Sequence, residues 1–456
     1  MTFQKKITAV GICLSMCAFN ATAQTLDESG RSNTIVPTAE SRPTNTFGMR
    51  ELVMLVLQNH PELSQAEAES RMAVSRVKEA SAGKYPQLSF SSSYGQEQQK
   101  LYLSNRSNTF TDQAQAQLKL TQPLYDTSLG ANVKRLKAGS LGYDWQLVTT
   151  REQLMLRTVE LYIEVIRHHQ LTELARQNLK LHRNYVSQIK DIALTDIGRA
   201  SDLSVAQARV ALAESTFTNR LVRLESARLQ WRNHSGMNSP DMGAIVNLDQ
   251  LSKELGNVPL PQTLDQAITE SINNSPQLQK SLSDVKSSWH SLEISRSVTK
   301  PKINAEAVTR TGQNYGFVLG RQDDVTVGVN LQWVLPINPG YKHGNRAARE
   351  AVLASESAVD STTYKVKTAV ETQWFELLAN QSSVDTFNVY VQSSEQVVNA
   401  YSEQFKIGRR SLLDVLNAEN ELFTARTNVL TAISDTSLSA WRLLSLRGYL
   451  ADYLEL

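Results

Sequence analysis

Two long stretches that lack proline and carry one interior glycine each constrain this 456-residue sequence more than any other feature. The first lies between Pro123 and Pro240, and the second follows Pro339. Away from their ends, their only glycines are Gly198 and Gly408. Proline and glycine are the strongest helix breakers, so their absence predicts very long helices. A lone glycine where the apolar pattern restarts predicts a turn, so we expect two long helical hairpins.

The N-terminus predicts a secretory signal peptide over residues 1–23. Lys5 and Lys6 precede an apolar run that is too short to span a bilayer, and a small-residue cleavage site follows it. Both cysteines, Cys13 and Cys17, lie in this segment, and neither follows the pattern of a lipoprotein cysteine. Residues 24–46 are polar and contain two prolines, so we expect a flexible tail.

The charge balance argues against nucleic acid as a partner. Removing Lys5 and Lys6 with the signal peptide leaves 45 basic and 45 acidic residues. The histidines His168, His169 and His182 lack the paired spacing of three or four that metal ligands on one helix need, so we expect no metal. No catalytic motif or cofactor-binding motif is present, and we expect neither a cofactor nor an enzyme.

The chain is a tandem duplication. Pro61 and Pro276 lie 215 positions apart, and the same offset separates Pro86 from Pro301. A Trp-Arg pair at 231–232 also recurs at 441–442. We therefore expect a first repeat over 47–236, a linker that packs around the waist over 237–262, a second repeat over 263–448 and a C-terminal tail over 449–456.

Each repeat contains two segments with the alternation of β-strands. The clearest has an apolar residue at every second position, and its members are Val325, Val327, Val329, Leu331 and Trp333. A soluble hairpin with one buried face explains this pattern, and so does a transmembrane barrel with strands of about 9–11 residues. Four strands cannot close a barrel, whose minimum is about eight, whereas twelve strands from three chains can.

The expected helices are long. Residues 129–197 and 345–407 would form helices of roughly 100 Å and 95 Å at about 1.5 Å per residue. The return helices, 201–233 and 411–447, are about half as long. Each could stack on the helix that begins a repeat, 49–82 or 264–298, which would complete a tall cylinder wall.

The duplicated order of helix, two strands and helical hairpin behind a signal peptide resembles the TolC family of outer-membrane export channels. The most specific marks are the tips around Gly198 and Gly408 and the segment Gln122-Pro123-Leu124 that leaves the second strand. The resemblance implies a mainly α fold with a small β part. It also implies a homotrimer with a twelve-stranded barrel in outer-membrane lipid and a helical α-barrel tunnel in the periplasm.

The resemblance also assigns roles to residues near the tips. Gly198, Arg199, Gly408 and Arg409 match the tips at which a periplasmic adaptor, or membrane fusion protein, and an energised inner-membrane transporter dock.

Asp414 matches an acidic ring at the closed tunnel mouth, and Arg410 matches a basic residue that helps to hold the mouth closed. Asn417 replaces a second acid, and Asp202 is displaced from the expected partner position, which leaves the partner of Arg410 open. Asp414 on its own is also typical of a helix cap or of the first turn of a helix, where acids are favoured.

The expected function is the exit duct of a tripartite export system. We favour type I secretion of a large unfolded protein through an inner-membrane ABC transporter. Small-molecule or drug efflux with a proton-driven pump is the alternative, and a secreted coiled-coil scaffold is an alternative of another class.

Overall fold

The computed structural model describes residues 49–99, 109–193, 200–237, 260–314 and 320–455. The predicted signal peptide and N-terminal tail, the first hairpin tip with Gly198 and Arg199, and most of the linker lie outside these ranges.

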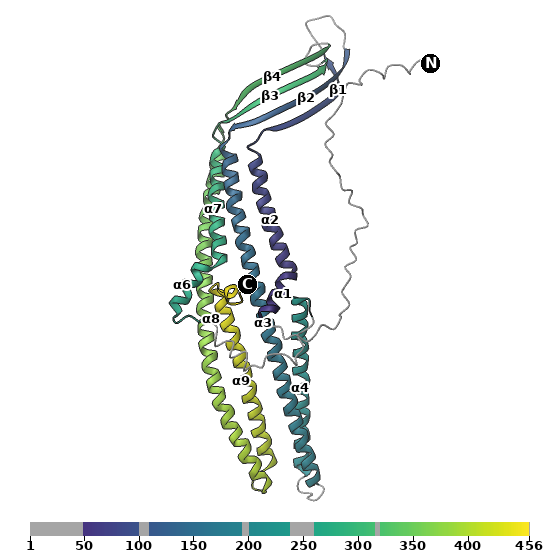
Figure 1. Cartoon of the computed structure of the whole chain (residues 1–456), viewed down its shortest axis with the longest axis vertical. Coiled ribbons are helices and arrows are strands. Elements are labelled where there is room, and N and C mark those ends of the chain that lie inside the picture. The colour runs from purple at the N-terminus through teal and green to yellow at the C-terminus, as the bar shows by residue number, and fades with distance from the viewer. Residues whose placement is uncertain (1–48, 100–108, 194–199, 238–259, 315–319, 456) are drawn as a thin grey trace, which may run out of the picture. The chain divides into compact units, whose positions relative to one another are not determined.

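The order of elements repeats along the chain (Figure 1). The first half comprises α1 (Met49–Asn59), α2 (Pro61–Ala82), β1 (Gln87–Gln99), β2 (Thr109–Tyr125), α3 (Thr127–Ala193) and α4 (Ala200–Ser235). The second half comprises α6 (Leu264–Asn274), α7 (Pro276–Ser297), β3 (Lys302–Gln313), β4 (Arg321–Gln332), α8 (Gly340–Lys406) and α9 (Leu412–Leu446). A short helix, α10 (Leu450–Tyr453), follows.

The helices expected over 49–82 and 264–298 are each broken into two, which corrects the sequence expectation. Pro61 and Pro276 occupy the first turns of α2 and α7, where the missing N–H would have no helical partner. The preceding residues are extended and cap the new helices: the His60 side chain accepts from Glu62 N, and Ser275 accepts from Leu278 N. Proline therefore restarts a helix here.

The long helices agree with the absence of breakers. α3 and α8 contain 67 residues each, or about 100 Å. α8 begins five residues earlier than predicted, at Gly340. The shorter α4 packs along α3, and α9 packs along α8 and α3 (Figure 1).

The four strands form one antiparallel sheet in the order β1-β2-β3-β4. β3 extends to Gln313 and β4 starts at Arg321. Trp333 lies one residue beyond β4, where its Nε1 donates to Thr299 O at 3.0 Å. Within the described chain β1 and β4 are the two edges, and each pairs on one side only.

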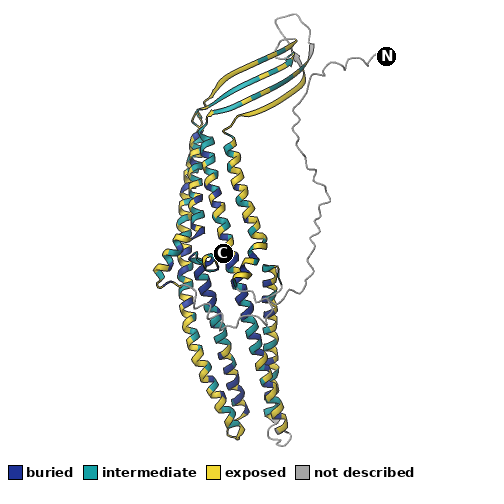
Figure 2. Cartoon of the chain, in the orientation of Figure 1, coloured by how far each residue is buried: buried dark blue, intermediate teal, exposed yellow. Residues whose placement is uncertain are grey.

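The largest apolar cluster lies where α1, α3, α4, α9 and α10 meet. Trp231 and Trp441, the repeated tryptophans, are both buried in it. α10 contributes Leu450, which is fully buried, so the predicted C-terminal tail is in part a packed helix. Figure 2 shows that burial is concentrated along α3 and α9, while much of α8 is exposed.

Candidate functional site

One face of the sheet is apolar and exposed. In an antiparallel pair, directly opposed residues share a face, and Phe90 opposes Leu118 while Ala307 opposes both Leu120 and Val327. The predicted strand residues continue this face, and their side chains are exposed: Val325 76%, Val327 78%, Val329 67% and Leu331 62%. This apolar face has no cover within the described chain.

The opposite face of the sheet is polar and its charges are paired. Lys119 of β2 contacts Glu306 of β3 at 3.0 Å. Arg310 of β3 donates to Gln117 of β2 at 3.3 Å and lies 3.7 Å from Asp324 of β4. Apolar and polar residues thus alternate along each strand, so that one face of the sheet is apolar and the other polar. This pattern is typical of a sheet that lies between lipid and water.

The second hairpin tip ends α8 in a glycine-dependent turn. Gly408 has φ +78°, a left-handed conformation that costs other residues. Its N–H donates to Phe405 O at 2.9 Å, and Arg409 N donates to Gln404 O at 2.9 Å. These two bonds form a Schellman motif, which satisfies the last carbonyls of α8. The tip is exposed, including Arg409.

Ser411 begins α9 and brings Asp414 and Arg410 together. The Ser411 hydroxyl accepts from Asp414 N at 3.2 Å and donates to Asp414 Oδ2 at 2.8 Å. Arg410 Nη1 lies 3.7 Å from Asp414 Oδ2, and its guanidinium stacks 4.1 Å from the centre of the Tyr401 ring. Arg410 Nε also donates to Gln404 at 3.1 Å. The partners of Arg410 that the sequence left open are therefore local to this tip.

Asn417 lies one turn beyond Asp414 and joins the two hairpins. Its side-chain oxygen accepts from Arg209 Nη2 of α4 at 2.8 Å. Asp202 lies in the first turn of α4, as its acidic character favours. On the side of Asn417 nearer to the tip, Ile189 of α3 packs with Leu412 and Leu416 of α9 in a small apolar cluster. Sequence reasoning did not find Arg209, because the contact depends on the packing of two helices that are far apart in sequence.

A buried carboxylate forms a second link between the hairpins. Glu419 of α9 is only 8% exposed, and its Oε1 accepts from the Tyr185 hydroxyl of α3 at 3.1 Å. Burial raises the pKa of Glu419, and burial beside this carboxylate raises the pKa of Tyr185 to about 12. Burial therefore favours a protonated Glu419, whereas the hydrogen bond from Tyr185 favours the carboxylate, and burial has the larger effect.

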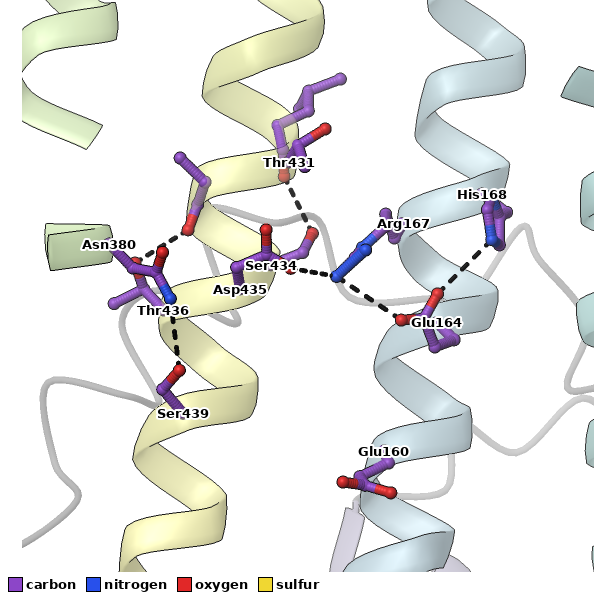
Figure 3. A network of polar contacts seen from close by, with 12 residues as sticks. Glu160, Glu164, Arg167, His168, Asn380, Thr431, Ser434, Asp435, Thr436 and Ser439 are labelled. Carbon is purple, nitrogen blue, oxygen red and sulfur yellow. Dashed lines mark hydrogen bonds and ion pairs between the residues drawn. The ribbon is translucent and has the colours of Figure 1, made fainter. Parts of the chain in front are cut away.

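Ion pairs hold α9 against α3 farther from the tip (Figure 3). Arg167 of α3 lies between Asp435 of α9 and Glu164 of its own helix. Nearer to the waist, Arg442 of α9 donates to Glu160 of α3 at 2.7 Å. The two hairpins thus contact each other through ion pairs here, and nearer to the tip through an apolar cluster and the hydrogen bonds of Arg209 and Tyr185.

The profile of the family described as outer membrane efflux protein matches residues 52–234 and 267–448, which is most of the chain. The chain belongs to the outer membrane efflux protein family. It is an outer-membrane export channel with a helical periplasmic part. Its members with solved structures are channels rather than enzymes.

Individual relatives agree with this assignment. The outer membrane efflux protein BepC of Brucella suis is 23% identical over 74% of this chain and 73% of its own length. The proteases secretion protein PrtF of Dickeya chrysanthemi is 23% identical over 90% of this chain and 89% of its own length. The outer membrane protein VceC of Vibrio cholerae has the same fold, with a TM-score of 0.74 at 15% identity over 88% of this chain and 96% of that one.

None of the described helices is long and apolar enough to cross a membrane. No group of three or more histidine, cysteine, aspartate or glutamate residues in these ranges could hold a metal ion. His168 contacts Glu164 at 3.4 Å, and His182 is buried between α3 and α4.

Proposed function

We propose that three copies of this chain close into one channel-tunnel that exports protein cargo across the outer membrane. The observation that supports a ring is that each copy has two different sides that no other part of the described chain covers. At the level of the sheet, β1 and β4 each leave one row of backbone groups unpaired within the described chain. Open sheet edges do not occur in hydrocarbon, so a sheet in the membrane must pair β4 of one copy with β1 of the next.

The helices have the same two open sides. α4 packs on α3 through one face, yet its other face is exposed at Leu212 55%, Val222 63% and Leu229 47%. These positions recur at intervals of ten and seven residues, which is the spacing of a second packing stripe. We call this set of three the α4 stripe.

α8 has a matching stripe. Phe375, Leu378 and Val389 are 60%, 47% and 63% exposed, and this set is named the α8 stripe. In Figure 1, β4 and α8 lie on one side of the described chain, and β1, α2 and α4 lie on the other. The open side with β4 and α8 would meet the open side with β1 and α4 of the next copy, which is a head-to-tail contact that closes into a ring.

Three copies fit a channel better than two. Two copies would supply eight strands, and an eight-stranded barrel is just wide enough for its own side chains to fill. Three copies supply twelve strands and leave an open lumen lined by the polar face of the sheet.

Support for protein cargo comes from PrtF, whose name assigns it to protease secretion and whose similarity extends over 90% of the chain. Efflux of small molecules is the second candidate, because BepC is named as an efflux protein. The exposed tip at Gly408 and Arg409 would contact a periplasmic adaptor in either case. The identity of the inner-membrane transporter then distinguishes protein secretion from small-molecule efflux.

Photocrosslinking in cells tests this proposal. A photoreactive amino acid at Arg409 should crosslink to an adaptor, and an ABC transporter should co-purify. The matched control is Lys342, which is exposed at the opposite end of α8 and should not crosslink to the adaptor. Co-purification of a proton-driven pump would replace secretion with efflux. If both positions capture the same proteins or neither captures a periplasmic partner, the tip is not the docking site.

A further inference from the structure

The histidines of this chain are distributed unevenly between the two hairpins. Of its seven histidines, four lie in α3 and α4: His168, His169, His182 and His234. α8 and α9 together contain one, His343, which is exposed near the start of α8. The two hairpins have the same architecture but differ in how many histidines they contain.

His182 lies on α3 near Arg209 of α4, and the contact between these two helices is called the seam. Buried residues of α3 recur around His182 at intervals of three, four and seven, as coiled-coil packing requires; they are Thr172, Ala175, Leu179, His182 and Ile189. His182 is 4% exposed, and its Nδ1 is buried without a hydrogen-bond partner among the described residues. Burial lowers its pKa, and Arg209 of α4 lowers it further. A proton on Nδ1 would therefore find neither an acceptor nor an opposite charge.

His168 and His169 lie about four helical turns nearer to the waist on α3. Burial lowers the pKa of both. At His168, Glu164 favours the charged form, whereas burial and the positive charges of Arg167, Arg220 and Arg223 oppose it. Around His169, Arg228 opposes the charge and Glu173 favours it. Asp435 of α9 pairs with Arg167, so its negative charge does not directly offset a positive charge on His168 or His169.

His234, in the last turn of α4, has the most strongly lowered pKa. The Thr158 hydroxyl donates to Leu154 O at 2.7 Å, so it accepts from His234 Nε2 at 2.9 Å. The His60 ring at the start of α2 lies 5.0 Å from the His234 ring, centre to centre. Burial, His60 and Arg157 together lower the pKa of His234 to about 4, although Glu62 and a backbone contact act in the opposite direction.

We propose that mild acid selectively loosens the first hairpin, α3/α4, and leaves the second hairpin, α8/α9, closed. The folded hairpin resists protonation of its histidines, whereas the separated helices accept protons at the ordinary histidine value of 6.5. The closed hairpin therefore keeps its full stability above that value and loses stability as the pH falls below it. Small solutes, including protons, cross the outer membrane. External acid would therefore lower the pH around the seam directly.

The second hairpin has the opposite tendency. Its buried titratable group, Glu419, has a pKa that burial raises, so the fold that buries this side chain gains stability as the pH falls. Acid would thus stabilise the surroundings of Glu419 on α9 while it weakens the seam between α3 and α4.

Hydrogen–deuterium exchange of the full-length oligomer at pH 7.5 and pH 5.0, corrected for intrinsic exchange rates, tests the proposal. Peptides of α4 should lose protection at pH 5.0 by about tenfold, after allowance for the partial exposure of His234. Peptides of α9 should change by less than about twofold. Equal losses in α4 and α9, or no loss in α4, would overturn the proposal without any variant being made.

A pair of variants then assigns the effect to the seam. His182→Gln keeps a polar side chain of similar size that cannot be protonated, and His234→Gln does the same at the end of α4. The double variant should reduce the acid-induced loss in α4 to about twofold or less. His343→Gln, on the exposed histidine of α8, is the matched control and should leave the full loss in place. An undiminished acid response in the double variant would refute the assignment to these histidines.

Discussion

At the scale of single residues, Asp414 illustrates how one side chain can have a local and a collective role. Its carboxylate accepts from Ser411 and lies near Arg410, so it stabilises the start of its own helix. The proposed ring of three would bring three such carboxylates to one mouth, where like charges attract cations and resist anions. The sequence predicted both roles for Asp414, and the single chain shows only the local one.

Asp414→Asn separates these roles, because it retains a hydrogen-bond acceptor for Ser411 and loses the charge. We expect single-channel conductance in a planar bilayer to rise and cation selectivity to fall, because the charged constriction is removed. Ser411→Ala is the control: it should cost about 1 kcal/mol of helix stability through the lost cap, yet leave selectivity nearly unchanged. If Asp414→Asn has the same cation selectivity as the unmodified protein, Asp414 is not part of the gate.

At the scale of elements, the sequence predicted most of the helices because their signals are local. The long runs without proline gave α3 and α8 to within a few residues, and the second tip lies at Gly408. The breaks at Pro61 and Pro276 were missed because the apolar pattern continues through them. The links Arg209–Asn417 and Tyr185–Glu419 could not be predicted, since they depend on how two hairpins face each other.

The Tyr185–Glu419 link between α3 and α9 should depend on pH. Burial raises the pKa of Glu419 although the bond from Tyr185 lowers it, so the fold that buries Glu419 is most stable below the ordinary value of 4.5 and loses stability as the pH rises through the raised value. Glu419→Gln keeps the acceptor without the charge. We therefore expect its melting temperature to exceed that of the unmodified protein by about 2 °C at pH 8 and by nothing at pH 4.5.

The control for this measurement is Glu421→Gln, an exposed neighbour on α9 that should not change the pH dependence. If the two variants shift the melting temperature equally at pH 8, surface charge rather than the buried link explains the effect.

At the scale of the whole molecule, the exposed stripes matter more than the buried core. A single chain of this family leaves apolar side chains uncovered on the sheet, on α4 and on α8. Alternation along β4 predicted the apolar face of the sheet. The two helical stripes were not predicted, because a sequence pattern does not show which of two apolar faces is covered within the chain.

Charge at the α8 stripe should disrupt the oligomer. Val389→Arg would place a cation against the α4 stripe of the next copy, and burying an unpaired charge is costly. We expect the trimer fraction in native mass spectrometry of detergent-solubilised protein to fall at least severalfold. Ile407→Arg places the same charge on an exposed apolar residue of the tip and should leave the trimer intact. A stable Val389→Arg trimer would contradict the proposed contact.

The packing of α10 has a consequence for how the protein is made. Leu52 and Val53 near one end of the described chain share a core cluster with Leu450 and Leu454 near the other. Arg50 and Glu455, which pair across the same region, are separated by 405 positions. Contacts of such long range form slowly, because a very large loop must close first. α1 can pack on α3 before the second half of the chain is present, but this core cluster stays incomplete until α9 and α10 have been exported.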